Sequence, residues 1–124
     1  QVDAKILNGD YKCCTNGGRE LSKYSIKDWI SAANENGVGE VHITSIDSEG
    51  TKQQFPEKLA SIALLSTDLP VILSGGIRSA DHIDSLVSKH GAKAFSMSSL
   101  SNICNISAID LRKDLLRYGH KVRV

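Results

Sequence analysis

The segment Ser74-Gly75-Gly76, which follows the apolar residues 69–73, is the clearest candidate for binding a ligand. An apolar run that contains a proline at its start predicts a short buried strand, and the paired glycines predict a sharp turn after it. Ser79 follows and can cap the first turn of a helix. Backbone N–H groups at such a strand–turn–helix junction attract anions, and phosphate is the ligand that this arrangement favours. On the motif alone, a tight turn without a ligand is the commoner interpretation.

Asp3 is a second candidate for chemistry. A carboxylate held in a cleft can transfer protons when its pKa is raised towards neutrality. On the residues alone, Lys5 favours a surface ion pair with Asp3 instead. His42 is more simply a hydrogen-bonded core residue than a metal ligand, because no group of His, Cys or carboxylate residues has ligand spacing.

The three cysteines, two of them adjacent at Cys13 and Cys14, match neither a disulfide framework nor a zinc pattern. Small apolar packing explains them more simply. We therefore expect no metal and no cofactor.

Strands and helices alternate in an order that would place these residues at strand ends. The sequence predicts strands at 1–5, 40–46, 70–74 and 92–97 and helices at 26–36, 56–65, 80–90 and 108–118. A turn at 8–10 predicts a hairpin with 11–15 as its return arm, and 16–20 reads as a flexible loop. Four βα units in 124 residues have the spacing of a (βα)8 barrel, in which ~250 residues make eight units. The predicted fold class is α/β: one domain, 1–124, forming a (βα)4 half-barrel of parallel strands with outer helices.

Composition narrows the range of partners. The chain has 15 Lys+Arg against 14 Asp+Glu, so the clustered basic surface typical of nucleic-acid binding is not expected. No apolar run approaches the ~18 residues of a membrane span, and no signal peptide is visible. We expect a cytoplasmic protein with neither nucleic acid nor membrane as a partner. Because the chain begins at Gln1 rather than Met, a processed chain or a piece of a longer one is expected.

Several segments together resemble one known family in their order and spacing. They are Asp3-Ala4-Lys5, 15–20, Gly39-Glu40, 44–51, Ser74-Gly75-Gly76 and 119–123. These segments resemble the C-terminal half of the cyclase subunit of imidazole glycerol phosphate synthase, from histidine biosynthesis. The most specific part is Thr44-Ser45-Ile46-Asp47 with Gly50-Thr51. The resemblance covers essentially the whole chain but only half of the family's length.

The resemblance implies a (βα)8 barrel with internal twofold symmetry. It also implies a reaction in which ammonia from a glutaminase partner closes an imidazole ring on a substrate with a phosphate at each end. In the family two aspartates, on the first and fifth strands, carry out the acid–base steps. Asp3 stands at the fifth-strand position. The first-strand aspartate belongs to the half that this chain lacks, which places independent catalysis in doubt.

The resemblance also implies the substrate and phosphate contacts of this half. They are made by Thr44, Glu49, Gly50, Ser74, Gly75, Gly76, Ser98 and Ser99. Gly50, Gly76 and Ser99 would hold one phosphate, while Thr44 and Ser74 would donate to the middle of the substrate. Glu49 replaces the usual aspartate and is one methylene longer.

Strand alternation gives a second prediction for the barrel interior. If Asp3, Thr44 and Ser74 face inward, four further residues do too: Gln1, His42, Ile72 and Ser96. Three of these four are polar where the family carries mostly branched apolar residues.

Four parallel strands would leave two unpaired edges, and a symmetric dimer is the simplest way to close them. Such a homodimer would place a second Asp3 across the barrel. The expected partners are therefore a second copy, a phosphorylated small molecule and a glutaminase subunit. Three functions stay open. The chain is a cyclase active only as a dimer or with a complementary half, a catalytically weak or inactive phosphate-binding half-barrel, or a cyclase-like protein of surface-sugar amidation.

Overall fold

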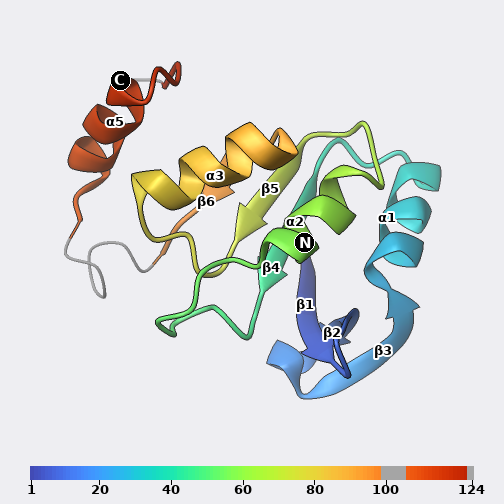
Figure 1. The fold of residues 1–124 in the computed structure, drawn as a ribbon. Coiled ribbons are helices and arrows are strands. Elements are labelled where there is room, and N and C mark those ends of the chain that lie inside the picture. The colour runs from blue at the N-terminus through green and yellow to red at the C-terminus, as the bar shows by residue number, and fades with distance from the viewer. Residues whose placement is uncertain (99–105, 123–124) are drawn as a thin grey trace.

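The structure is a computed structural model and describes residues 1–98 and 106–122. Within these ranges the strands form one six-stranded sheet in the order β3-β2-β1-β4-β5-β6 (Figure 1). The strands are β1 (Val2–Leu7), β2 (Asp10–Thr15), β3 (Glu20–Ser25), β4 (Val41–Ser45), β5 (Val71–Ser74) and β6 (Ala94–Ser96). The helices are α1 (Ile26–Glu35), α2 (Glu57–Leu64), α3 (Ala80–His90) and α5 (Ala108–Arg117), with a 3₁₀ turn, η1 (Asn16–Gly18).

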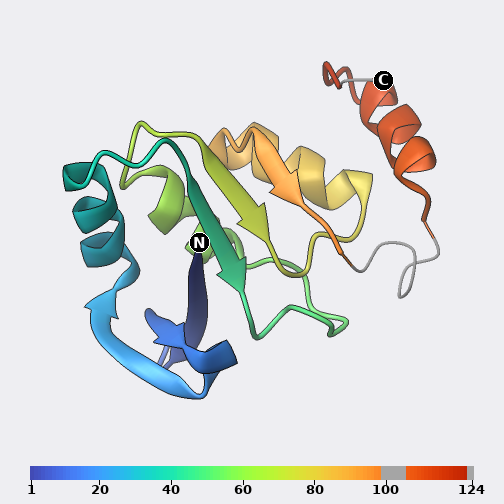
Figure 2. The ribbon, with the colours of Figure 1, turned by 180° about the vertical axis from the view of Figure 1, so that it is seen from behind.

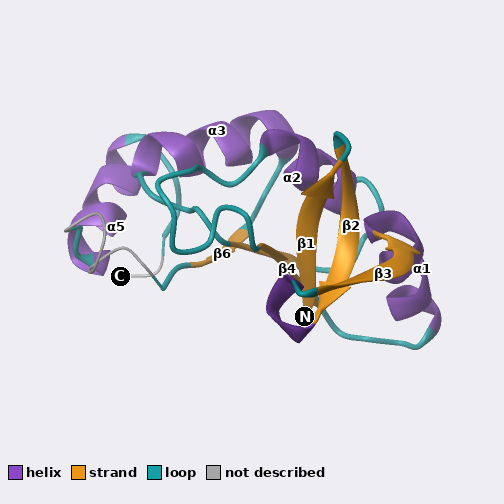
Figure 3. Cartoon of the chain, turned by 90° about the horizontal axis from the view of Figure 1, so that it is seen from below, coloured by secondary structure: helices purple, strands orange, loops and turns teal. Residues whose placement is uncertain are grey.

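Strands β1, β4, β5 and β6 are parallel neighbours, as the alternation of strands and helices predicts. The helices α2 and α3 lie along one side of these strands, and the opposite face is seen from behind in Figure 2. Viewed along the sheet, the strands curve with helices on the outside (Figure 3). This arrangement confirms the predicted α/β class and fits a half-barrel.

Two features of the sheet differ from the sequence prediction. Residues 20–25 form a third strand, β3, and only 16–18 make the short turn before it. In addition, β2 pairs with β1 from Asp3 to Leu7, so the expectation of an unpaired edge is wrong for that stretch. The side chains of β3 are mostly exposed, so its sequence lacks the alternation of apolar and polar residues that predicts a strand. Backbone hydrogen bonds to β2 hold it in the sheet.

The core lies between the parallel strands and the helices. Side chains alternate along each strand, so Val41 and Ile43 of β4 are buried against the helices and His42 faces the other way. The same period places Leu73 of β5 in the core and leaves Ile72 half-buried. The sequence identifies these core positions because the period of two is visible in it.

Capping hydrogen bonds confirm the predicted starts of α1, α3 and α5, whereas α2 begins at Glu57, one residue after the predicted Pro56. The Ser25 hydroxyl accepts from the Asp28 N–H at 3.2 Å, and the Asp28 carboxylate accepts from the Ser25 N–H, forming a capping box. The Ser79 and Ser107 hydroxyls cap α3 and α5 by accepting from the His82 N–H at 3.2 Å and the Asp110 N–H at 3.0 Å. A capping side chain hydrogen-bonds a backbone N–H group only two or three residues later, so the sequence alone is enough to predict where these helices start.

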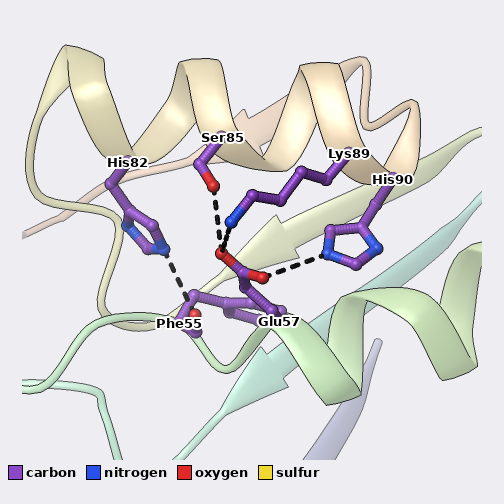
Figure 4. A network of polar contacts seen from close by, with 6 residues as sticks. All are labelled: Phe55, Glu57, His82, Ser85, Lys89 and His90. Atoms are coloured by element: carbon purple, nitrogen blue, oxygen red, sulfur yellow. Dashed lines mark hydrogen bonds and ion pairs between the residues drawn. The ribbon is translucent and has the colours of Figure 1, made fainter.

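Polar contacts of Glu57 join α2 to α3 (Figure 4). Its Oε1 atom accepts hydrogen bonds from Ser85 Oγ and Lys89 Nζ, each at 2.9 Å, and its Oε2 atom lies 3.5 Å from His90 Nε2. The hydrogen bond from Lys89 is the main cause that lowers the pKa of Glu57 to about 2. Because Glu57 and Lys89 are exposed, we expect these contacts to orient the two helices more than to stabilise them.

His82 on α3 is the buried member of the same region (Figure 4). Its Nε2 atom lies 3.2 Å from the Phe55 carbonyl oxygen, which can only accept, so Nε2 carries the proton. Its Nδ1 atom is buried and has no hydrogen-bond partner among the described residues. Burial therefore lowers the pKa of His82 below its usual 6.5.

We predict that the free energy of unfolding falls as the pH drops below 6.5, the usual pKa of this histidine. In that range the unfolded chain binds a proton at His82, whereas the folded chain does not until the pH is lower. Protonation therefore lowers the free energy of the unfolded state relative to the folded state. The Glu57 contribution is lost only at lower pH, between its usual pKa of 4.5 and about 2. Urea unfolding at several pH values measures the effect, with His82→Gln as the variant that lacks the titration. A parallel pH dependence in both proteins would contradict the assignment.

Candidate functional site

Four polar residues form one row across the parallel strands. The register pairs Asp3 with Thr44, Thr44 with Ser74, and Ser74 with Ser96. Paired residues of neighbouring strands present their side chains on the same face, and this face is the one opposite the helices. Asp3, Thr44 and Ser74 thus lie together, as the sequence prediction requires of a substrate-binding row.

Ser96 belongs to this row, which corrects the predicted second layer. Two residues earlier on each of these strands, His42 pairs with Ile72 and Ile72 pairs with Ala94. These three residues form the next layer on the same face, and Ser96 is not one of them. The neighbours of His42 on β5 and β6 are thus apolar. The Nε2 atom of His42 is buried and has no hydrogen-bond partner among the described residues, so this atom does not supply the hydrogen bond predicted for a core histidine. Strand β6 is shorter than the predicted strand 92–97 and spans only Ala94–Ser96. Its pairing with β5, which the sequence does not reveal, places Ser96 opposite Ser74.

Hydrogen bonds position the Asp3 carboxylate at one end of the row. The Gln1 side-chain amide donates to Asp3 Oδ1 at 3.2 Å and to Thr44 Oγ1 at 3.3 Å. The Lys5 ammonium donates to the Gly18 carbonyl at 3.3 Å, so its contact is with the η1 turn and not the predicted surface ion pair. Asp3 is half-buried and lines a cavity of about 250 Å³ together with Cys14 and Trp29.

Cys14 lies opposite Asp3 in the β1–β2 pair, a contact that the sequence analysis missed. Its Sγ atom donates to the Asp3 carbonyl at 3.2 Å. Burial, followed by the charge of Asp3, raises the pKa of Cys14, and burial raises the pKa of Cys13 to about 11. Both thiols are therefore protonated and unreactive near neutral pH, in line with the predicted packing role. The Asn8-Gly9 turn, both residues with positive φ, is the sequence signal that could have given this register.

The paired glycines after β5 are required by packing. Gly75 has φ +87°, and a Cβ built there would lie 2.4 Å from the Ser45 carbonyl oxygen. Gly76 has φ +85°, and its Cβ would lie 2.7 Å from the Gln53 carbonyl oxygen and the Phe55 nitrogen. The turn is thus pressed against β4 and the 53–55 segment, which explains both glycines without a ligand. Substitution of Gly76 by a larger residue would consequently test the fold rather than phosphate binding.

The loop after β4 contacts this turn at Ser48 and Gln53, and it also meets the loop after β6. The Ser98 hydroxyl donates to Glu49 Oε1 at 2.7 Å. Gly50 follows with φ +66°, and a Cβ built there would meet nothing within 4 Å, so its surroundings are open. The structure therefore brings together Glu49, Gly50 and Ser98, while Ser99 lies outside the described residues.

Two further searches concern metals and membranes. Across 1–98 and 106–122, no three His, Cys, Asp or Glu residues are arranged to hold a metal ion. Within the same ranges, no helix has both the length and the apolar character needed to cross a membrane.

Comparison with known proteins identifies the family. The profile described as "Histidine biosynthesis protein" matches residues 1–100. Imidazole glycerol phosphate synthase subunit HisF of Bacillus subtilis (strain 168) is 32% identical over 124 residues, covering 98% of this chain and 49% of the relative. The HisF subunit of Phocaeicola vulgatus is 35% identical over 125 residues, covering 99% of this chain and 49% of the relative. That of Thermotoga sp. (strain RQ2) is 29% identical, covering 99% and 48%.

The chain thus spans about half the length of the curated relatives it matches. This half-length match agrees with a half-barrel of parallel strands, and it confirms the resemblance inferred from the ordered motifs. The matched range includes every strand of the sheet. The chain therefore belongs to the histidine biosynthesis protein family.

Proposed function

We propose that this chain is half of a cyclase of the imidazole glycerol phosphate synthase type. In this proposal ammonia, supplied by a glutaminase partner, closes an imidazole ring on a substrate with two terminal phosphates. The observation that carries the proposal is the row from Asp3 through Thr44 to Ser74, all on the face opposite the helices. The relatives named imidazole glycerol phosphate synthase subunit HisF support the reaction class.

The row supplies one carboxylate and several hydroxyl groups. Asp3 would transfer protons at one end, and Thr44 and Ser74 would hydrogen-bond the polar middle of the substrate. The reaction as proposed needs a second aspartate, which a complementary half or a second copy would provide. A twofold-related copy would also duplicate the phosphate loop and so bind both ends of the substrate.

The proposed phosphate site comprises Gly50, the Ser74-Gly75-Gly76 turn, Ser98 and Ser99. Open space at Gly50 and the hydroxyl of Ser98 favour an anion here, and barrels of this type often bind phosphate beyond their last strands. The Glu49 carboxylate accepts from Ser98, so it would have to release that hydroxyl when a phosphate binds.

We predict that Glu49→Gln binds inorganic phosphate about fivefold more tightly than the unmodified chain. Removing one negative charge a few ångströms from the phosphate is worth about 1 kcal/mol even when water screens it fully. Isothermal titration with phosphate measures the affinity. Glu20→Gln, an exposed carboxylate on β3, is the matched control and should leave the affinity unchanged. Equal affinities in all three proteins would argue against this location.

The assay that tests the function measures ammonia-dependent ring closure in three samples: this chain alone, the chain with a separately produced N-terminal half of a HisF relative, and that half alone. Turnover by the chain alone or by the mixture supports the cyclase. The second candidate is a phosphate-binding half-barrel without turnover, favoured by the single aspartate, Asp3, in the row. Phosphate binding without ring closure in any sample would select that candidate.

A further inference from the structure

We propose that Arg78 binds the phosphate and at the same time holds the loop after β4, residues 46–56, against the β5–α3 turn, residues 75–79. This inference rests on the proposed function, because it assigns a further residue to the proposed phosphate site. The guanidinium group of Arg78 supplies the positive charge that lets this site prefer a phosphate dianion to a neutral ligand.

Arg78 joins the two loops that carry the glycines of the proposed phosphate site. It lies in the β5–α3 turn, two residues after Gly76. Its Nε atom donates to the Gln53 carbonyl oxygen at 3.0 Å, and Gln53 belongs to the loop after β4. The same loop contains Gly50, three residues before Gln53. The hydrogen bond therefore fixes the side chain of Arg78 against the loop of Gly50.

The Gln53 carbonyl oxygen also locates the guanidinium group next to Gly76. A Cβ built at Gly76 would lie 2.7 Å from this oxygen, so the oxygen that accepts from Arg78 is in close contact with the turn. The Gly76 carbonyl in its turn accepts from the Phe55 N–H at 3.1 Å. These contacts hold the two loops together, and the guanidinium group lies where they meet.

The charges of these loops explain why a cation is needed here. Glu49 contributes a carboxylate, whose Oε1 atom accepts from Ser98. This carboxylate repels a phosphate beside it, so binding requires a positive charge close by. Lys52 is exposed, whereas Arg78 is half-buried and its guanidinium group is oriented by Gln53. An oriented arginine loses less conformational entropy on binding than an exposed lysine does, which favours Arg78 as the phosphate ligand.

The chemistry of the guanidinium group suits both tasks. It carries five N–H donors in one plane and is not deprotonated in proteins. The hydrogen bond to Gln53 uses the donor on Nε. The N–H groups on the two Nη atoms form a fork whose geometry matches two oxygens of a phosphate. One arginine can therefore hold the loop and bind the anion.

Isothermal titration with inorganic phosphate tests the proposal on the unmodified chain and three variants. Arg78→Gln should weaken binding at least about tenfold, as expected for loss of a charged hydrogen bond to the ligand. Arg78→Lys keeps the charge but loses the fork, so its affinity should lie between those of Arg78→Gln and the unmodified chain. Lys52→Gln is the matched control, because it removes the same charge from an exposed side chain of the same loop. It should change the affinity by less than about twofold.

Salt dependence separates a contact with phosphate from a purely structural role of Arg78. Sodium chloride screens the attraction between charges, so the phosphate affinity of the unmodified chain should fall as salt is added, and that of Arg78→Gln should fall less. A residue that only held the loop would weaken binding without changing this dependence. Circular dichroism checks that every variant folds. Equal losses of affinity in Arg78→Gln and Lys52→Gln, or parallel salt dependence in Arg78→Gln and the unmodified chain, would overturn the proposal.

The failure of this inference and that of the proposed function give different results. Phosphate binding is measured without substrate or ammonia. A phosphate affinity that depends on Arg78, in a chain that closes no ring in any sample, supports this inference and contradicts the cyclase. Ring closure together with a phosphate affinity that Arg78→Gln leaves unchanged supports the cyclase and overturns this inference. An unmodified chain that binds no phosphate overturns it as well.

Discussion

Replacing Asp3 by asparagine is expected to lower the rate of ammonia-dependent ring closure by about 10²- to 10⁴-fold, the usual contribution of a general acid or base. Asparagine keeps the size of the side chain and can still accept from the Gln1 amide, which donates to Asp3 Oδ1 at 3.2 Å. It cannot exchange a proton. The fold should therefore survive while proton transfer fails.

The measurement compares turnover of the unmodified and Asp3→Asn chains in the sample that shows ring closure. Asp68→Asn is the control, because Asp68 is an exposed aspartate before β5, at the end of the strands away from Asp3. It should keep full activity. Equal rates for Asp3→Asn and the unmodified chain would exclude Asp3 from the chemistry, even if the family assignment stands.

The second large effect concerns stability. Gly75→Ala is expected to lower the free energy of unfolding by about 2–5 kcal/mol, the sum of a left-handed backbone penalty and overpacking. Its Cβ would lie 2.4 Å from the Ser45 carbonyl oxygen, and that oxygen belongs to the central strand β4. Neither the backbone at Gly75 nor the Ser45 carbonyl can move away without disturbing the pairing of β4 with β5.

Gly91→Ala separates the two contributions to this loss. Gly91 ends α3 with φ +73°, and a Cβ there would meet nothing within 4 Å. Alanine at this position should cost only the backbone penalty, about 1–2 kcal/mol. Urea unfolding followed by far-UV circular dichroism measures both variants. A Gly75→Ala chain no less stable than Gly91→Ala would show that the turn can relax away from Ser45.

This result bears on how the Gly-Gly motif is interpreted. From the motif alone, a tight turn without a ligand was the commoner interpretation, and a phosphate site was the alternative. The structure gives both glycines a packing reason that holds with or without phosphate. The proposal of a phosphate site therefore depends on Gly50, Ser98 and the row of Asp3, Thr44 and Ser74. The paired glycines allow the tight turn, but they are not evidence for phosphate binding.

Local signals in the sequence predicted most of the fold. The capping residues Ser25, Ser79 and Ser107 marked the helix starts, and apolar alternation marked β4 and β5. The ordered motifs from Asp3 to Gly76 were specific enough to identify the family. Each of these signals acts within a few residues or within one motif, so no knowledge of distant contacts is needed to interpret it.

Tertiary structure alone decided which distant residues meet. The strand register aligned Ser96 with Asp3 and left His42 beside Ile72, and hairpin pairing placed Cys14 opposite Asp3. Strand β3 formed by pairing with β2, although its exposed side chains show no burial pattern. Register and edge coverage depend on hydrogen bonds between segments far apart in the chain, and side-chain periodicity does not encode which segment is the neighbour. For that reason the sequence determined the family and the candidate residues, while the structure determined how they are arranged.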